Sequence, residues 1–249
     1  MMRETTVFGP IFSRRLGSSL GINLLPQKGK ICNFDCVYCE CGWNKDGRGD
    51  TLLPTADDVR KALEDKLAAC AAVGTSIDSI TFSGDGEPTL NPAFPEIIDI
   101  TLSLRDRYYP SAKVSVLSNA TRIGREEVFQ ALRKVDNAIL KIDAPTDAEA
   151  ALINRPAPGY HVADVVEHLR RFDGAFVLQT MFLKGPGWAT EDWVDRWMDL
   201  VRELRPQEVM AYTVDRETPM KGLQKYTVEE MRALVQPLLN EGYQIQIKG

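Results

Sequence analysis

The sequence predicts an α/β protein, a partial (β/α)6 TIM-like barrel with parallel strands. Short apolar runs of strand length alternate with stretches of helical period, and this alternation favours a parallel sheet. About six such repeats occur, which favours a barrel or partial barrel over the separated layers of an α+β fold. No low-complexity linker divides the chain, so residues 1–249 are expected to form a single domain.

The first half of the chain contains two predicted helices. Thr55 stands three residues before Asp58, which predicts an N-cap and a helix over residues 55–70. One apolar stripe runs along this helix and places its cysteine in the core: Val59, Leu63, Leu67 and Cys70. A strand over residues 79–83 leads through a glycine-rich turn into a helix opened by Pro92. The apolar side of that second helix comprises Phe94, Ile97, Ile98 and Leu102.

The second half repeats the same strand-then-helix unit. In each predicted pair the strand comes first and the helix second: 114–117 with 126–133, 138–142 with 162–171, 176–182 with a helix from Thr190, and 209–214 with 227–239. A last strand is predicted at residues 243–247. Trp193 and Trp197 follow a 3.6-residue period in the helix after Thr190, so they are expected to pack in the core.

Composition limits the class of protein. A formal net charge of −5 gives no basic footprint for nucleic acid, although Arg3, Arg14 and Arg15 form a local basic group. No apolar run approaches the length of a membrane span and the first residues lack the apolar core of a signal peptide, so a cytoplasmic protein without a membrane partner is expected. Five cysteines, an odd number, indicate reduced thiols or metal ligands rather than a disulfide framework.

Three closely spaced cysteines are candidate metal ligands. Cys32, Cys36 and Cys39 have the spacing CxxxCxxC, which brings three thiolates together without a fourth at fixed distance. Three thiolates can hold three irons of a cubane and leave the fourth iron open to an exogenous ligand. A four-thiolate zinc site with Cys41 is the alternative, although so compressed a run makes tetrahedral geometry awkward.

The CxxxCxxC run with an aromatic residue, Tyr38, before the last cysteine resembles the motif of the radical S-adenosylmethionine (radical SAM) superfamily. The segment 83–88, Ser-Gly-Asp-Gly-Glu-Pro, is similar to the Gly-Gly-Glu motif of that family with one inserted residue, and segments 117–120 and 141–145 also end strands. Segments 8–17, 32–39 and 212–216 resemble the branch related to tRNA wyosine synthases. That likeness covers most of the chain, but no cysteine precedes Cys32 to hold the second cluster of wyosine synthases.

The resemblance implies the cofactors and their ligands. It implies a [4Fe-4S] cluster on Cys32, Cys36 and Cys39, with SAM on the open iron cleaved by one electron to a 5'-deoxyadenosyl radical. The residues expected beside SAM are Tyr38, Gly84, Gly86, Glu87, Ser118 and Asn119. An ordinary turn at residues 84–87 and plain strand-end caps at residues 118–119 are the alternatives. The electron donor would be a protein such as flavodoxin or ferredoxin.

Lys141 and Asp143 are the candidate catalytic pair. They share one parity along the strand at residues 138–142, opposite to Leu140 and Ile142, so they are expected to point into the barrel. An inward Lys-Asp pair serves either substrate binding or a structural ion pair. Less specific candidates for the same cavity are Gln179 and Thr213, whereas His161 and His168 are expected at the surface.

Three functions remain open at this stage. The first is a radical SAM enzyme that abstracts hydrogen from an unidentified substrate, RNA, protein or small molecule, with an RNA base suggested by the branch. The second is an activating enzyme that generates a radical on a partner protein. The third is a non-catalytic, zinc-stabilised binding module.

Overall fold

The computed structural model describes residues 5–13, 16–47, 49–185, 188 and 190–249. The chain divides into two compact units. The first unit contains Met1–Cys32, Asn44–Ser118 and Gly124–Ala138, and the second contains Asn33–Trp43, Asn119–Ile123 and Ile139–Gly249. The single domain predicted over residues 1–249 stays a prediction. The basic group formed by Arg3, Arg14 and Arg15 lies outside the described residues.

The first unit contains a hairpin followed by parallel strands. Strand β1 (Val7–Ser13) pairs antiparallel with β2 (Gly17–Ile22). Strand β2 then pairs in parallel with β3 (Ser79–Phe82), and β3 with β4 (Lys113–Ser118). The hairpin was not predicted because Pro10 interrupts the strand pattern; β1 lies at the edge of the sheet, where proline is tolerated.

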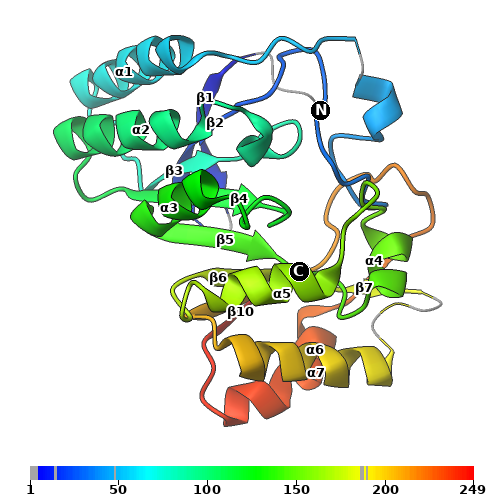
Figure 1. The fold of residues 1–249 in the computed structure, drawn as a ribbon. Helices are drawn as coiled ribbons and strands as arrows, with labels where there is room; N and C mark the ends of the chain where they lie inside the picture. The colour runs from blue at the N-terminus through cyan, green and yellow to red at the C-terminus, as the bar shows by residue number, and fades with distance from the viewer. Residues whose placement is uncertain (1–4, 14–15, 48, 186–187, 189) are drawn as a thin grey trace. The chain divides into compact units, whose positions relative to one another are not determined.

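Three helices accompany these strands. Helices α1 (Ala56–Ala72), α2 (Phe94–Tyr108) and α3 (Glu126–Lys134) lie along one side of the strands of this unit (Figure 1). Two short 3-10 turns, η1 (Asn44–Gly47) and η2 (Pro88–Leu90), complete the unit. The predicted Thr55–Asp58 capping box is confirmed, and Cys70 is buried with the predicted stripe of α1. Helix α2 begins two residues after Pro92 and buries Leu104 in place of Leu102.

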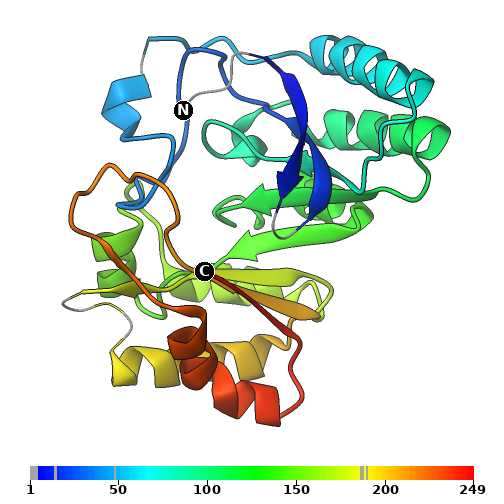
Figure 2. The ribbon, with the colours of Figure 1, turned by 180° about the vertical axis from the view of Figure 1, so that it is seen from behind.

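The second unit is also built on parallel strands. Strand β5 (Asn137–Lys141) crosses into it from the first unit and pairs with β6 (Val177–Met181), which pairs with β8 (Glu208–Tyr212). The last strand, β10 (Ile245–Lys248), runs parallel to β8 at the end of the chain (Figure 2). A small antiparallel pair, β7 (Leu183–Lys184) with β9 (Gln224–Lys225), lies apart from this sheet.

Four helices belong to the second unit: α4 (Asp147–Ile153), α5 (Val162–Arg170), α6 (Glu191–Leu204) and α7 (Val228–Asn240). Helix α4 and the β7–β9 pair were not predicted, since both are too short to show a clear period. The predicted strands and longer helices are confirmed, most of them within two residues at their ends. No helix of the described residues is both long and apolar enough to cross a bilayer.

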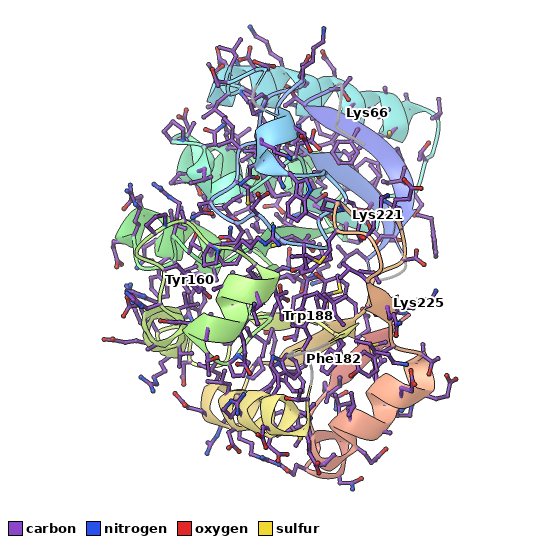
Figure 3. All side chains as sticks on the ribbon, turned by 90° about the vertical axis from the view of Figure 1, so that its right-hand side faces the viewer. Lys66, Tyr160, Phe182, Trp188, Lys221 and Lys225 are labelled. Atoms are coloured by element: carbon purple, nitrogen blue, oxygen red, sulfur yellow. The ribbon has the colours of Figure 1, made fainter. Side chains whose placement is uncertain are left out.

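The tryptophans of α6 pack in the core, as predicted. Trp193 and Trp197 are at most 1% exposed, and their rings stack with centroids 6.1 Å apart. Phe182, labelled in Figure 3 close to α6, meets both rings edge-on at 5.3 and 5.2 Å. The indole of Trp197 donates a hydrogen bond to Thr180 Oγ1 at 3.0 Å. These aromatic contacts join α6 to the end of β6.

A half-buried carboxylate stabilises the first unit. Asp136 Oδ2 accepts hydrogen bonds of 2.8 Å from Arg105 and from the Val114 backbone N–H. Burial opposes ionisation of Asp136, but these two bonds outweigh it and hold the pKa of its carboxyl below the ordinary value. The pKa of Asp136 is lower in the folded protein than in the unfolded chain. The carboxylate therefore contributes its full stabilisation at pH values above the pKa of the unfolded chain. This stabilisation is lost as the pH falls through the lower pKa of the folded protein.

We therefore expect Asp136→Asn to lower the free energy of unfolding by about 1–3 kcal/mol at neutral pH. The difference from wild type should shrink below about pH 4, where the unfolded carboxylate itself becomes protonated. Urea unfolding at several pH values measures both effects. Asp99→Asn, which removes an exposed pair with Lys134, serves as the control and should change little. An equal loss at pH 7 and pH 3 would contradict this account.

Candidate functional site

The cysteine loop is held by its backbone. In the second unit, the N–H groups of Asp35 and Val37 donate to the carbonyls of Asn154 and Ile153 at 2.8 and 2.9 Å. The Ala157 N–H donates to the carbonyl of Asn33 at 2.8 Å. These three bonds attach the segment between the cysteines to the end of α4 and the residues that follow it.

The cysteines themselves are reduced and partly exposed. Cys32, Cys36, Cys39 and Cys41 form no disulfides. A turn, in which the Cys39 N–H donates to the Cys36 carbonyl at 3.1 Å, joins the last two cysteines of the motif. In the described parts of the chain, no three His, Cys, Asp or Glu side chains are grouped so that they could hold one metal ion. In a cubane, each thiolate binds a different iron, so the three sulfurs need not converge on one point.

An apolar cluster lies under the loop. Val37 and Tyr38 pack with Ile153, Met181 and Leu183, and all five are at most 7% exposed. Cys36, Trp43, Trp188 and Tyr212 are among the partly buried residues that pack against this cluster. Trp43 also lies under the guanidinium of Arg155, 4.8 Å from the ring centroid. The Cys36 side chain therefore packs against an apolar surface on the side of Val37 and Tyr38.

A polar network adjoins Cys36. Lys141 Nζ donates to Tyr38 Oη at 2.9 Å and also to Tyr212 Oη. Asp143 Oδ2 lies 3.7 Å from Lys141 Nζ and accepts a hydrogen bond from Tyr38 Oη. Asp143 Oδ1 accepts the backbone N–H of Met181 at 2.8 Å. The predicted pair thus faces inward, with the side chains of Lys141 and Asp143 only 14% and 0% exposed.

Burial and charge shift the pKa values in this network. Burial raises the pKa of the Cys36 thiol to about 11, although Lys141 opposes this shift. Burial, reinforced by Asp143, also raises the pKa of Tyr38 well above its usual range. Burial acts to lower the pKa of Lys141, but Asp143 and Tyr212 outweigh it and leave the pKa raised. Lys141 therefore stays charged, and Tyr38 stays neutral, at physiological pH.

The donor set suits an iron–sulfur cluster. Three thiols on one short loop would supply the ligands of three irons, and coordination would deprotonate a thiol whatever its intrinsic pKa. Cys36 Sγ already receives a hydrogen bond of 3.4 Å from Asn154 Nδ2, the kind of contact that a cluster thiolate commonly accepts. These features fit the predicted cluster, and Cys32, Cys36 and Cys39 stay its predicted ligands.

The glycine-containing turn lies against the residue before Cys32, within the first unit. Ile31 N–H donates to the Asp85 carbonyl at 3.2 Å, and Glu87 N–H donates to the Ile31 carbonyl at 3.0 Å. Gly86 has φ +141°, and a Cβ there would lie 1.9 Å from the Ile31 carbonyl oxygen. A Cβ on Gly84 would lie 2.1 Å from Asn23 Oδ1. Both glycines allow close packing within the chain, whereas their contacts with SAM stay predictions.

Glu87 and Ser118 are joined in the same unit. Glu87 is 2% exposed, and its Oε1 accepts hydrogen bonds from Ser118 Oγ at 2.8 Å and Thr89 Oγ1 at 2.6 Å. The Thr89 backbone N–H also donates to this oxygen at 3.1 Å. The carboxylate therefore fixes the turn to the end of β4.

Asn119 is attached to the residue after Cys32, within the second unit. Its Nδ2 donates to Asn33 Oδ1 at 2.7 Å, and its Oδ1 accepts from Thr121 Oγ1 at 2.7 Å. Asn33 Nδ2 in turn donates to Thr121 at 2.6 Å. The two residues that flank Cys32 in the sequence, Ile31 and Asn33, are thus each bonded to one of the motifs predicted to bind SAM.

The less specific candidates fall in different places. Gln179 is buried, and its Nε2 lacks a hydrogen-bond partner among the described residues. Thr213 Oγ1 accepts the backbone N–H of Tyr226 at 3.2 Å, which gives it a structural role. His161 precedes α5 with a 59% exposed side chain paired to Asp147, so its surface position is confirmed.

Sequence reasoning missed Asn154, Tyr212, Asn33 and Asn23. Asn23 Oδ1 accepts the Asp85 backbone N–H at 3.2 Å and so supports the turn. Asn33 lies inside the cysteine motif, and this position could have marked it as a candidate. Tyr212 begins a segment that the wyosine-synthase likeness includes, but no pattern in the sequence singles out Asn154.

The parallel α/β architecture and the three-cysteine loop are typical of a class of barrel enzyme with an iron–sulfur cofactor. The model of the radical SAM superfamily matches residues 27–201, and the chain belongs to that superfamily. A UPF0026 protein of Synechocystis sp. is 33% identical over 221 residues, which cover 86% of this chain and 77% of that protein. A UPF0026 protein of Methanocaldococcus jannaschii is 31% identical, with 90% and 68% covered.

Solved structures show the same fold. A radical SAM methyltransferase from Sphaerobacter thermophilus has a TM-score of 0.71 at 15% identity, with 95% of this chain and 67% of that chain covered. SuiB from Streptococcus suis, solved with S-adenosylmethionine, has a TM-score of 0.65 at 14% identity. The match covers 89% of this chain and 49% of SuiB, so this chain corresponds to about half of that protein.

These findings confirm the predicted fold class, the partial TIM-like barrel with parallel strands. The protein is an enzyme of SAM-dependent radical chemistry, and its family implies a [4Fe-4S] cluster and SAM as cofactors. Membership of the radical SAM superfamily favours an enzyme over the zinc-stabilised binding module. The wyosine-synthase branch is not confirmed and stays a hypothesis.

Proposed function

We propose that the protein binds a [4Fe-4S] cluster through Cys32, Cys36 and Cys39 and abstracts hydrogen from a substrate that is still to be identified. When bound, the cluster supplies the electron that cleaves the sulfonium of SAM to methionine and a 5'-deoxyadenosyl radical. The main observation in support of the proposal is that both residues next to Cys32 in the sequence, Ile31 and Asn33, are hydrogen-bonded to motifs predicted to bind SAM.

We propose roles for the motif residues that agree with their positions. The turn at Gly84, Gly86 and Glu87 would receive the SAM amino group, with backbone carbonyls as acceptors because Glu87 Oε1 already bonds Ser118 and Thr89. Ser118 and Asn119, at the end of β4, would reach the ribose or carboxylate of SAM. Tyr38 would contribute through its backbone, because its hydroxyl is bonded to Lys141 and Asp143.

The apolar surface against which Cys36 packs would limit the access of water to the site. Val37, Tyr38 and Met181 exclude water from one side of the cysteine loop. Water exclusion protects a reactive radical from side reactions, which is a main task of the protein in cofactor-driven chemistry. Lys141 supplies a fixed positive charge in the same unit, and we propose that it faces the substrate, with Asp143 as its counter-ion.

The substrate class is proposed as RNA, specifically a base, on the likeness to the wyosine-synthase branch. An activating enzyme that forms a radical on a protein is the second candidate, because a structural neighbour, SuiB, has been solved with a precursor peptide. An electron donor such as flavodoxin or ferredoxin would reduce the cluster. A cytoplasmic location agrees with the five reduced cysteines and stays a proposal.

The test is cleavage of SAM without substrate. Protein reconstituted with iron and sulfide under anaerobic conditions and reduced with dithionite should convert SAM slowly to 5'-deoxyadenosine and methionine. Chromatography of the products measures this conversion against protein that lacks iron. Fractions of RNA, protein and small molecules from a cell extract, added in turn, should reveal the stimulating class. Fully loaded enzyme that yields no 5'-deoxyadenosine above the control with every fraction would overturn the proposal.

A further inference from the structure

Asn154 is the side chain that joins Cys36 to the polar network. It follows the last residue of α4 and is 2% exposed. Its Nδ2 lies 2.6 Å from Asp143 Oδ2 and 3.4 Å from Cys36 Sγ. The hydroxyl of Tyr38 lies 3.4 Å from the same nitrogen. All four residues belong to the second unit.

The network fixes which end of the Asn154 amide faces the thiol. Asp143 Oδ2 already accepts a hydrogen bond from Tyr38 Oη, so the group of Asn154 that lies 2.6 Å from this oxygen is assigned as the NH2 and not the carbonyl. Asp143 is itself fixed, since its other oxygen accepts the Met181 backbone N–H. One N–H of Asn154 is thereby committed to Asp143, and the second has Cys36 Sγ and Tyr38 Oη within reach, each 3.4 Å from the nitrogen. Tyr38 Oη already accepts a hydrogen bond from Lys141, which leaves Cys36 Sγ as the acceptor that we assign to it.

The side chain of Asn154 is not needed to end the helix. The backbone N–H of Asn154 bonds to the Ala150 carbonyl at 2.8 Å, and its carbonyl accepts the Asp35 N–H at 2.8 Å. The first bond closes the last turn of α4 and the second attaches the cysteine loop to it, and both survive any substitution of the side chain except proline. The buried amide therefore has a role apart from the fold of α4, and the thiol beside it indicates which one.

We propose that Asn154 is a positioning residue that donates an N–H···S hydrogen bond to the cluster ligand Cys36 and thereby raises the reduction potential of the cluster. Asp143 orients the amide for this bond. The reduced cluster gains one electron from an external reductant and so carries one more negative charge, which a donor to the sulfur stabilises more than it stabilises the oxidised form. This inference rests on the proposed function, because it requires Cys36 to bind iron.

The experiment compares the midpoint potential of the reconstituted cluster in four proteins: wild type, Asn154→Leu, Asn154→Ser and Thr146→Ala. Leucine removes the donor while keeping the branched shape of the side chain, whereas serine keeps a smaller hydroxyl donor. Thr146→Ala is the matched control, because Thr146 caps the start of α4 and its loss loosens the same helix without touching the amide. A redox titration followed by electron paramagnetic resonance gives each potential, and iron analysis gives the loading.

The expected result is full iron loading throughout, with a more negative potential in Asn154→Leu, an intermediate value in Asn154→Ser and no change in Thr146→Ala. Unchanged potentials in both Asn154 variants would overturn the inference and leave the proposed function intact. Loss of iron from both Asn154 variants, with Thr146→Ala still loaded, would also overturn it, because Asn154 would then serve retention of the cluster. Absence of iron from wild type would overturn the proposed function itself.

Discussion

Replacing Cys32, Cys36 or Cys39 by alanine should each abolish bound iron, which we expect at about four atoms per chain in the reconstituted wild type. Each thiolate binds a different iron of the cubane, so the loss of any one leaves a second iron without a protein ligand. Two remaining thiolates are too few to retain the cluster against exchange with solvent. Iron and sulfide analysis after anaerobic reconstitution measures the effect, together with the brown colour of the protein.

Cys70→Ala and Cys41→Ala are the matched controls. Cys70 is buried in α1 of the first unit, and its substitution should leave the iron content unchanged and cost only a modest loss of stability. Cys41 lies two residues beyond the motif, and its substitution should also leave the cluster in place. Iron lost in Cys41→Ala as fully as in the three motif variants, or colourless wild type with one zinc per chain, would contradict the assignment of ligands.

Glu87→Ala should weaken the binding of SAM while leaving the iron content unchanged. The Glu87 carboxylate holds Thr89 and Ser118, so its removal leaves buried donors without an acceptor and loosens the turn next to Ile31. Hydrogen bonds to a charged group contribute about 1.5–3 kcal/mol each, and if loosening of the turn costs the binding of SAM about that much, the affinity falls roughly 10–100-fold. Equilibrium dialysis with labelled SAM measures the change.

The control for this experiment is Glu127→Ala, which removes a carboxylate that is 60% exposed on α3. It should bind SAM as wild type does. Unchanged affinity in Glu87→Ala would show that the turn tolerates loss of the carboxylate and that its backbone alone serves SAM. Loss of iron in Glu87→Ala would instead assign the turn a role in forming the cysteine loop.

The sequence predicted the repeating part of the fold because local signals decide it. The helix that begins after Thr55 combines a capping box with a stripe that ends at Cys70, and α6 combines an N-cap with two core tryptophans. The inward direction of Lys141 and Asp143 follows from the alternation of side chains along a strand. In each case the pattern lies within one helix or strand, so no knowledge of distant residues is needed.

Most parts of the fold and the site that the sequence did not predict depend on contacts between residues distant in the chain. Asn154 meets Cys36 only because α4 pairs with the cysteine loop, and asparagine at a helix end is too common to indicate a site. Tyr212 reaches Lys141 from a strand more than 70 residues away along the chain. The β1 hairpin was missed for a local reason, since Pro10 breaks a strand pattern that an edge strand can still carry.

The backbone bonds between the cysteine loop and α4 bear on how the metal centre is assembled. A zinc finger gains its fold from the metal, because its ligands are not held in place beforehand. Here the peptide groups of Asp35 and Val37, rather than the thiolates, hold the loop. We therefore expect that iron and sulfide can be inserted after the chain has folded, and that a cluster destroyed by oxygen can be rebuilt on the same molecule without a cycle of unfolding.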